Sequence, residues 1–343
     1  MMASHPRSSS IDLDSPDRPF DNIINFRDVG RSINRLMGKK VLNEGVLFRS
    51  ARLDDASERD KRRLTDELHI ATIIDLRSTS EHQMATAKLH AESGTSAPPN
   101  INTDHLFQLP HVRRQLISLA GKAFERSLLW RLDWWNFLYE YLPFLVSPPL
   151  SRCMGWMMDK TTGISNGETN EVNSKVLALA ASGYRIDAVM IIGQQVMSPR
   201  GLIGLGLDML DSSTAEMREI FELFASQNDG ADRTYPVLVH CTQGKDRTGL
   251  VVLMLLLLTG VVSDEAMTAD YVQSEPELVV EAEERMKEIR KLGLPEDYIK
   301  CPDWFTVEIR RHLDERYGGV DGYLRFVGVE KKKLDVIREA LIA

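Results

Sequence analysis

The sequence predicts an α/β fold, with a central and mostly parallel sheet flanked by helices. Three observations lead to this prediction. The runs 71–76 and 235–239 are rich in β-branched and other apolar residues, which is typical of buried strands. The apolar run 250–258 follows the second of these after a short loop and predicts a buried helix. A further helix, carrying Leu64 and Leu68, precedes the first strand.

The remaining N-terminal elements complete this outline. The first 19 residues are rich in Ser, Asp and Pro, and we expect residues 1–19 to be a disordered tail. Residues 45–50 predict a short strand that leads into a loop, and Ser57 suits the N-cap of the helix that follows. We therefore expect a single domain over residues 20–343.

The segment from about residue 91 to residue 200 differs from its surroundings. Its stretch 116–145 is mostly helical in pattern and contains three tryptophans. We interpret the segment 91–200 as a helical insertion within the domain. Its aromatic side chains are either the core of this insertion, or a lid or lipid-touching face.

The chain after the insertion is expected to be helical apart from the strand before residue 240. Ser213 and Glu216 form a capping box at the start of one helix. Further helices are expected over 277–292, from Pro302 onwards, and over 329–342.

Charge and composition limit the function classes. The net charge of −8 argues against nucleic acid, and against an anionic membrane surface, as a general partner. The three cysteines form no disulfide framework and suit a reducing compartment. The longest apolar runs are too short to span a bilayer, and no signal pattern opens the sequence. We expect a soluble cytoplasmic protein, with a nuclear location left open and lipid contact at most transient.

The ten residues HCTQGKDRTG, at 240–249, join the second predicted strand to the buried helix. They place Cys241 and Arg247 six positions apart. Such a loop can point several backbone N–H groups at one oxyanion, and the helix N-terminus adds partial positive charge that favours a thiolate. The arginine fork can grip two oxygens of a phosphate. This pattern predicts phosphoryl transfer, with Cys241 as nucleophile of a phosphocysteine intermediate and Arg247 as phosphate ligand.

The other loop residues support this chemistry. Thr248 either bonds the thiolate and helps to expel it, or caps the helix, or does both. Gly244 and Gly249 permit a tight loop and close helix packing. His240 is expected to hold the loop by hydrogen bonds and not to act as a general base. The residues predicted to bind the substrate are His240, Thr242, Gln243, Gly244, Lys245 and Gly249.

Two loop residues and one residue outside the loop leave alternatives open. Lys245 is either a second cation, for a substrate with several phosphates or a lipid head group, or a solvated lysine. Asp246 is either the general acid or a carboxylate that pairs with an arginine. Asp75 ends a predicted parallel strand, where the binding crevice of such sheets lies, and is therefore the rival acid or a partner that orients Arg247. Arg27 and Arg49 are expected to form buried ion pairs.

No metal site is predicted, because the histidines and cysteines show no metal-ligand spacing. The cluster at 201–206 has the wrong glycine order for a dinucleotide loop and follows no strand, so it predicts no nucleotide cofactor.

The loop resembles that of the atypical tyrosine-phosphatase-like family of bacteria and fungi, which reads His-Cys-x-x-Gly-Lys-Asp-Arg-Thr-Gly. The resemblance covers most of residues 20–90 and 200–343 and leaves the insertion almost untouched. The other matching segments are 25–30, 45–50, 74–78, 270–271 and 317–324.

This resemblance implies a cysteine-dependent (Cys-x5-Arg) phosphatase fold without a metal or other cofactor. It ties Lys245 to broad specificity and Asp246 to acid catalysis. It implies a protein phosphatase acting on phosphotyrosine, and also on phosphoserine, phosphothreonine and phosphoinositides. The alternatives are a phosphate-binding module without turnover and a phosphatase specific for inositol phosphates or phosphoinositides. An arsenate reductase would need further cysteines near Cys241, and the sequence places none there.

Overall fold

The computed structural model describes residues 20–93, 107–131, 193–226, 233–291 and 293–343. The chain divides into two compact units, which are described separately. The first comprises Met1–Gly121, Gly206–Glu281 and Cys301–Ala343, and the second comprises Lys122–Leu205 and Ala282–Lys300. The tail 1–19 and most of the segment 91–200 lie outside the described residues. The disordered tail, the helical insertion and the single domain therefore stay predictions.

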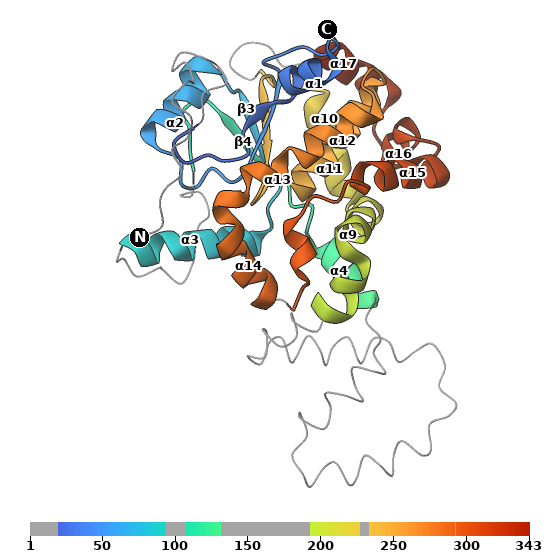
Figure 1. Cartoon of the computed structure of the whole chain (residues 1–343). Helices are drawn as coiled ribbons and strands as arrows, with labels where there is room; N and C mark the ends of the chain where they lie inside the picture. Colours follow the sequence, from blue (N-terminus) through green and yellow to red (C-terminus); the bar gives the residue numbers. More distant parts are fainter. Residues whose placement is uncertain (1–19, 94–106, 132–192, 227–232, 292) are drawn as a thin grey trace, which may run out of the picture. The chain divides into compact units, whose positions relative to one another are not determined.

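Within its described residues, the first unit holds a five-stranded sheet in the order β1-β2-β5-β3-β4 (Figure 1). The strands are β1 (Arg27–Asp28), β2 (Leu47–Ser50), β3 (Thr72–Asp75), β4 (Arg113–Leu116) and β5 (Val237–His240). β1 is antiparallel to β2, and the other pairs are parallel. The predicted mixed α/β fold with a mostly parallel sheet is confirmed.

β5 is the central strand, and all four of its residues are buried. It lies between β2 and β3, with His240 opposite both Ser50 and Asp75. Because parallel strands run in the same direction, their carboxyl ends meet at one edge of the sheet. The loop that follows His240 therefore begins beside the ends of both neighbouring strands.

The two faces of the sheet are covered by different helices. One face carries an apolar cluster that joins Phe48, Ile73 and Leu238 to Leu64. Figure 1 shows α2 (Glu58–Arg62) on this side and α10 (Thr214–Phe224), α11 (Asp246–Thr259) and α12 (Asp264–Val272) on the other. α11 is buried along most of its length, as its apolar sequence predicts.

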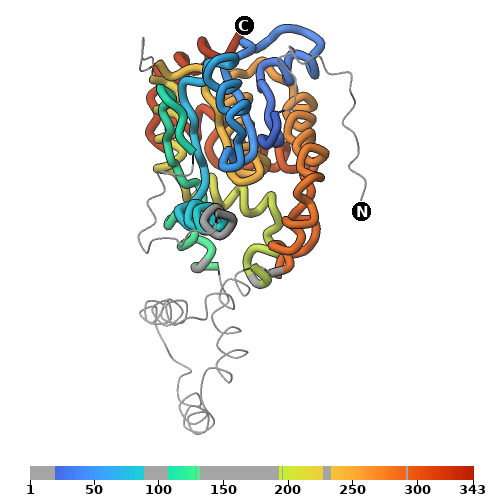
Figure 2. Tube along the Cα trace, turned by 90° about the vertical axis from the view of Figure 1, so that its left-hand side faces the viewer, coloured from blue at the N-terminus to red at the C-terminus, as the bar shows by residue number. Residues whose placement is uncertain are grey.

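The remaining described helices of the first unit lie around this framework. They are α1 (Val29–Met37), η1 (Arg63–Glu67), α3 (Thr79–Ser93), α13 (Ser274–Glu277), η5 (Val279–Glu281), α15 (Phe305–Tyr317), α16 (Val320–Phe326) and α17 (Lys331–Leu341). The segment after α1 lies beside the C-terminal end of the chain (Figure 2). Asn43 N donates there to Leu341 O of α17 over 2.8 Å. The second unit contains α4 (Lys122–Trp130), η3 (Gly193–Met197), α14 (Ala282–Lys291) and η6 (Glu296–Ile299), and α9 (Ser198–Ser212) belongs in part to each unit.

Three expectations about elements need correction. β4 lies inside the segment that was expected to be helical. The sequence did not predict this strand, because an edge strand with the polar sequence RRQL has no apolar pattern. The helix expected over 277–292 is divided into short pieces and α14. Ser213 precedes α10 as expected but forms no capping box, since its hydroxyl donates to Leu119 O over 2.8 Å. Ser57, in contrast, does cap α2 as predicted.

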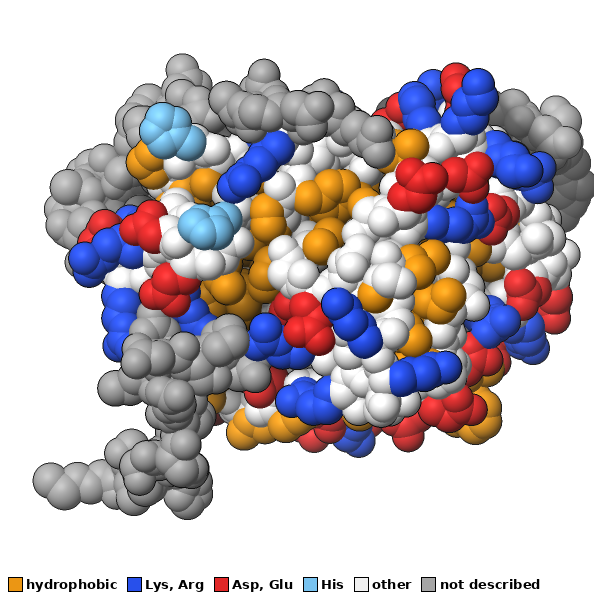
Figure 3. Space-filling model, turned by 90° about the horizontal axis from the view of Figure 1, so that it is seen from above, with side chains coloured by type: hydrophobic (Ala, Val, Ile, Leu, Met, Phe, Trp, Pro, Cys, Tyr) orange, Lys and Arg blue, Asp and Glu red, His pale blue; other side chains and the backbone are white. Residues whose placement is uncertain are grey.

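Acidic and basic side chains of the described residues are interspersed on the face shown in Figure 3. Among the residues that the structure describes, no helix combines the length and apolar character needed to cross a bilayer. The cytoplasmic location stays a prediction.

Candidate active site

The loop between β5 and α11 turns tightly around the Cys241 thiol. Cys241 is buried, and Gly244 N–H donates to its Sγ over 3.2 Å. Gly244 has a φ of 67°, and a Cβ added to it would lie 2.1 Å from Ser50 O. Any larger residue would therefore force the loop away from β2.

Three backbone carbonyls of the loop point outwards to fixed donors. Thr242 O accepts from Arg52 N over 3.0 Å, and Gln243 O accepts from Asn25 Nδ2 over 2.9 Å. Gly244 O accepts from Arg49 over 2.8 Å. Because a peptide unit is planar and trans, an outward carbonyl turns the next N–H inwards. The loop thus presents a concave row of amide donors around the thiol.

Arg49 belongs to a buried ion-pair network behind the loop. Its guanidinium lies 2.7 Å from Asp270 Oδ2, while Arg27 lies 2.8 Å from Oδ1 of the same carboxylate. Burial raises the pKa of Asp270, but the two arginines outweigh burial and leave it at about 2. The expectation that Arg27 and Arg49 form buried ion pairs is confirmed, and Asp270 is the shared partner. This network fixes the loop to β2 and α12.

Arg247, in the first turn of α11, is held by Glu81. Its two terminal nitrogens lie 2.6 Å from the two carboxylate oxygens, in a bidentate pair. Burial lowers the pKa of Arg247, but the pair with Glu81 outweighs burial and leaves the pKa above its ordinary value. The guanidinium is therefore charged and oriented before any ligand binds.

Glu81 is the site residue that sequence reasoning missed. It lies in the first turn of α3, where it accepts from Ser78 N over 2.8 Å, and the Ser78 hydroxyl accepts from Glu81 N in return. Glu81 also accepts from Thr242 Oγ1 over 2.5 Å. Burial raises its pKa, but Arg247 above all lowers it to about 2. The motif Ser78-x-x-Glu81 is a capping-box signal that marks this helix start in the sequence.

Asp75 lies at the end of β3, fully buried at 0% exposure. Arg77 donates to both of its oxygens, and Arg114 donates to Oδ2 over 2.7 Å. His240 and His82 each lie 3.5 Å from Oδ2. Burial raises the pKa of Asp75, but His240 and Arg77 outweigh burial and hold it far below its ordinary range. Asp75 is thus an ionised carboxylate surrounded by cations.

His240 faces the sheet and not the concave side of the loop. Its Nδ1 lies 3.2 Å from Cys241 O, and its other ring nitrogen faces Asp75. Burial lowers the pKa of His240 to about 4, although Asp75 opposes this effect. The imidazole is therefore neutral near pH 7.

Lys245 and Asp246 stand at the junction of the loop and α11. Lys245 has 0% exposure, so the interpretation of a solvated lysine is wrong. Its Nζ lies 3.7 Å from Asp246 Oδ1. The Asp246 side chain is 35% exposed, and its Oδ1 has no hydrogen-bond partner among the described residues. Asp246 therefore combines access to solvent with an unsatisfied carboxyl oxygen.

Thr248 and Gly249 lie one turn into α11. Thr248 is fully buried, and its hydroxyl has no hydrogen-bond partner within the described part of the chain. A Cβ on Gly249 would lie 3.0 Å from the Tyr271 ring, so this glycine lets α12 approach α11 closely. The close approach at Gly249 agrees with the expected helix packing, and the roles of Thr248 stay predictions.

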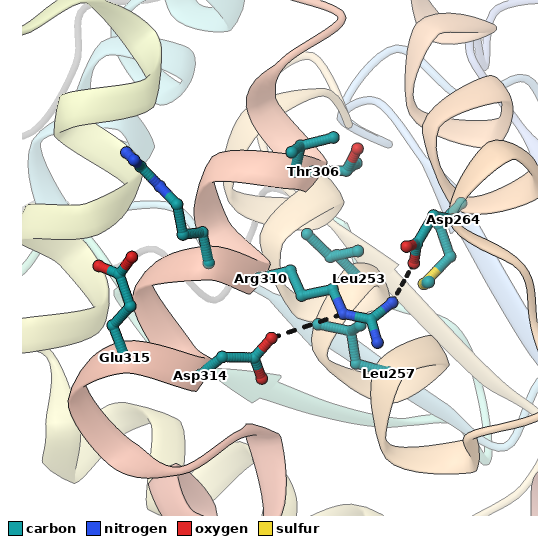
Figure 4. A pocket seen from close by; sticks show the side chains of 10 residues that line it. Leu253, Leu257, Asp264, Thr306, Arg310, Asp314 and Glu315 are labelled. Carbon is teal, nitrogen blue, oxygen red and sulfur yellow. Dashed lines mark hydrogen bonds and ion pairs between the residues drawn. The ribbon is translucent and has the colours of Figure 1, made fainter.

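A pocket of about 390 Å³ lies among α11, α12 and α15, away from the loop (Figure 4). Leu253 and Leu257 of α11 contribute apolar side chains, and Arg310 bridges Asp264 and Asp314 beside them. No residue of the segment 240–249 lines it. The pocket is therefore separate from the candidate active site.

The sequence is similar to those of known proteins. The model of the tyrosine phosphatase family matches residues 18–130 and 193–343. The chain is similar to the tyrosine-protein phosphatase of Nostoc commune, with 31% identity over 38% of this chain and 46% of that protein. It is also similar to the triple specificity protein phosphatase PtpB of Mycobacterium tuberculosis, with 28% identity over 93% of this chain and 96% of that protein. The matched region of the first relative spans about half of its length.

Proposed function

We propose that this chain, which belongs to the tyrosine phosphatase family, hydrolyses phosphomonoesters of proteins through a phosphocysteine on Cys241. The observation that carries the proposal is the combination at one loop. A buried thiol accepts from Gly244 N–H over 3.2 Å, and Arg247 is held by Glu81 over 2.6 Å. A nucleophile, an amide cradle and a fixed guanidinium are the parts that phosphoryl transfer to a thiolate needs.

In the first step the Cys241 thiolate attacks phosphorus in line with the leaving oxygen. The S–P bond forms as the P–O bond breaks, and the leaving oxygen takes a proton from a general acid. The loop amides and Arg247 bind the three remaining oxygens and stabilise their developing charge. We assign no metal ion to this step, since the loop and Arg247 supply the positive charge.

We assign the general acid to Asp246 rather than to Asp75. A general acid must be protonated and must reach the leaving oxygen. Asp75 is buried, ionised and occupied by Arg77 and Arg114. Asp246 is partly exposed at the loop, and its Oδ1 makes no hydrogen bond with the described residues. A phosphate dianion beside it would favour its protonated form.

In the second step a water molecule attacks the phosphocysteine. Asp246, now a carboxylate, takes a proton from this water, so that phosphate leaves and the thiolate is restored. The Thr248 hydroxyl, which has no hydrogen-bond partner among the described residues, would then donate to the departing sulfur. Amides and the Arg247 guanidinium again hold the phosphoryl oxygens.

Phosphotyrosine is the substrate that we propose first. The name of the mycobacterial relative supports a range wider than one residue type. Parallel phosphate release from phosphotyrosine, phosphoserine and phosphothreonine peptides and from phosphoinositides tests that range. The binding module without turnover is the rival function, and the presence of both Cys241 and Arg247 argues against it.

The decisive experiment replaces the nucleophile. Cys241→Ser is expected to abolish turnover of an aryl phosphate while keeping the fold and the binding of a phosphorylated peptide. The loop cradle does not depend on the nucleophilicity of sulfur, so binding survives. Cys301→Ser is the matched control and is expected to keep activity. Full activity in Cys241→Ser would overturn the mechanism, and binding without turnover in the unmodified protein would favour the binding module.

The assignment of the acid predicts different pH profiles for two variants. Asp246→Asn is expected to remove the alkaline limb of the kcat profile, because that limb reports the loss of the acid's proton. Asp75→Asn is expected to keep this limb and to lose stability, since it removes the buried charge that pairs with Arg114 and that Arg77 shares with Asp54. Kinetics between pH 4 and pH 9, together with urea unfolding, distinguish the effects of the two variants. An alkaline limb that vanishes in Asp75→Asn instead would reverse the assignment.

A further inference from the structure

Tyr271 of α12 is a buried side chain that the mechanism above does not use. Its ring stacks on Phe305, with centroids 4.6 Å apart and the planes 10° from parallel. Its hydroxyl makes no hydrogen bond of regular geometry with the described residues, although Asp246 lies near enough to raise its pKa as a hydrogen-bond partner does. Buried hydroxyl groups are normally paired, so one without a regular hydrogen bond beside a catalytic loop calls for a functional explanation.

The ring lies against the start of α11. Its Cδ2 and Cε2 atoms would be 3.0 and 3.1 Å from a Cβ on Gly249. Asp246 is three residues earlier and therefore occupies the same face of the helix. The Tyr271 hydroxyl and Asp246 Oδ1 thus occur on facing elements, and neither atom makes a hydrogen bond of regular geometry within the described part of the chain.

The charges around this pair keep Tyr271 protonated. Burial raises the pKa of Tyr271 well above its ordinary value. The charge of Asp246, Cys301 and a hydrogen-bond contact with Asp246 raise it further, while Arg49 lowers it. Burial also raises the pKa of Cys301 to about 12, so this thiol is neutral. The charged neighbours of Asp246 are Lys245, at 3.7 Å, and Arg247. Tyr271 therefore faces Asp246 as a hydrogen-bond donor.

We propose that Tyr271 is a positioning residue for the general acid. Its hydroxyl donates to Asp246 Oδ1 when substrate is bound, and Oδ2 then carries the proton toward the leaving oxygen. Tyr271 keeps its own proton throughout, and the transferred proton comes from Asp246 alone. The inference rests on the proposed function and adds a side chain that neither touches the phosphate nor reacts.

This role predicts that the importance of Tyr271 depends on the leaving group. A 4-nitrophenolate leaves without needing a proton, whereas the alkoxide of phosphoserine and the phenolate of phosphotyrosine require one. The Tyr271 hydroxyl would also stabilise the ionised form of Asp246, because it donates to the carboxylate. Its removal would then raise the pH at which the acid loses its proton.

Tyr271→Phe tests the inference, because it keeps the stacked ring and deletes one oxygen. Removing a buried hydroxyl that makes no regular hydrogen bond with the described residues costs little stability, so the variant is expected to fold. We expect kcat on a phosphotyrosine peptide to fall by about tenfold or more. On 4-nitrophenyl phosphate it should change by less than about twofold, and the alkaline limb on the peptide should move to higher pH. In an Asp246→Asn background the same change should have no further effect.

Tyr323→Phe is the matched control, since this buried hydroxyl donates to Leu210 O over 2.8 Å, away from the loop. It is expected to lose stability without any dependence on the leaving group. Equal losses on both substrates in Tyr271→Phe, no loss at all, or additivity with Asp246→Asn would overturn the inference. Failure of the unmodified protein to hydrolyse any phosphate ester would overturn the proposed function instead, so the two failures are distinguishable.

Discussion

Glu81 is the side chain on which the orientation of Arg247 depends. It accepts from both terminal nitrogens of the guanidinium over 2.6 Å and from Thr242 Oγ1 in the loop itself. A flexible arginine that is fixed in advance loses less conformational entropy when it binds a phosphate. We therefore expect Glu81 to assist the proposed reaction without touching the substrate.

Replacing the Glu81 carboxylate should reduce the stabilisation of the transition state more than the stability of the fold. Glu81→Gln keeps the side-chain shape but removes the charge that fixes Arg247, and kcat/KM on an aryl phosphate is expected to fall about a hundredfold. Glu222→Gln, which removes a carboxylate paired with Lys333 at a distance from the loop, is the control. Steady-state kinetics and phosphate binding check the effect. Unchanged kcat/KM in Glu81→Gln would show that Arg247 needs no such partner.

The sequence predicts some residues of the candidate site and carries no signal for others. Cys241 and Arg247 are visible because both lie in one short segment with a characteristic spacing. Glu81 is 166 positions from Arg247 along the chain, so no local pattern connects them. The burial of Lys245 is equally hidden, because it depends on elements that pack around the loop from elsewhere in the sequence.

At the scale of elements, the loop between β5 and α11 is shaped by the neighbouring strand. Gly244 has a φ of 67° and its Cβ position is filled by the backbone of Ser50 and Ala51. Its carbonyl also accepts from Arg49, whose guanidinium is fixed by Asp270. Contacts with β2 and α12 therefore together determine the curvature of the loop.

Gly244→Ala is expected to distort this curvature. A methyl group would lie 2.1 Å from Ser50 O, and the positive φ adds strain, so we expect a loss of about 2 kcal/mol or more and loss of phosphate binding. Gly260→Ala is the control, because Gly260 has a similar φ of 68° with open space around it. That variant should lose about 1 kcal/mol and keep its activity. Urea unfolding and phosphate binding measure both, and equal behaviour of the two variants would contradict the role of β2.

The elements were predictable to different degrees. β3, β5 and α11 are buried and apolar, so hydrophobic pattern and length predict them. β4 was missed because its side chains are polar and its strand character comes from pairing with β3, from Thr72↔Arg113 onwards. An edge strand of this kind is specified by its neighbour and not by its own sequence.

At the scale of the whole molecule, buried histidines link stability to pH. His240 and His82 are both buried next to Asp75, and burial lowers the pKa of each. For His240 the pKa falls from 6.5 to about 4. Between these values the unfolded chain binds a proton that the folded chain does not, so stability decreases as the pH falls from about 6.5 to about 4.

His240→Gln is expected to reduce this acid sensitivity. Because the pKa of His240 is lower in the folded chain, this residue accounts for a loss of about 3 kcal/mol in the free energy of unfolding as the pH falls through this interval. The variant is less stable near pH 7, where it lacks the native packing, but its stability should change less between pH 7 and pH 4. His69→Gln, at an exposed position, is the control and should follow the native protein. Urea unfolding at several pH values measures how the free energy of unfolding depends on pH. The same dependence in the native protein and in His240→Gln would exclude this linkage.

The sequence by itself predicted the proposed reaction class, because the candidate nucleophile, the candidate phosphate ligand and the glycines of the loop all lie within ten residues. The tertiary structure decided the environment of each group. It buried Asp75 among arginines, enclosed Lys245, joined Glu81 to Arg247 and set Tyr271 against the start of α11. The physical reason is that charge state and orientation depend on burial and on partners from distant segments. Those contacts form only when the strands assemble and α3 and α12 pack around their carboxyl ends.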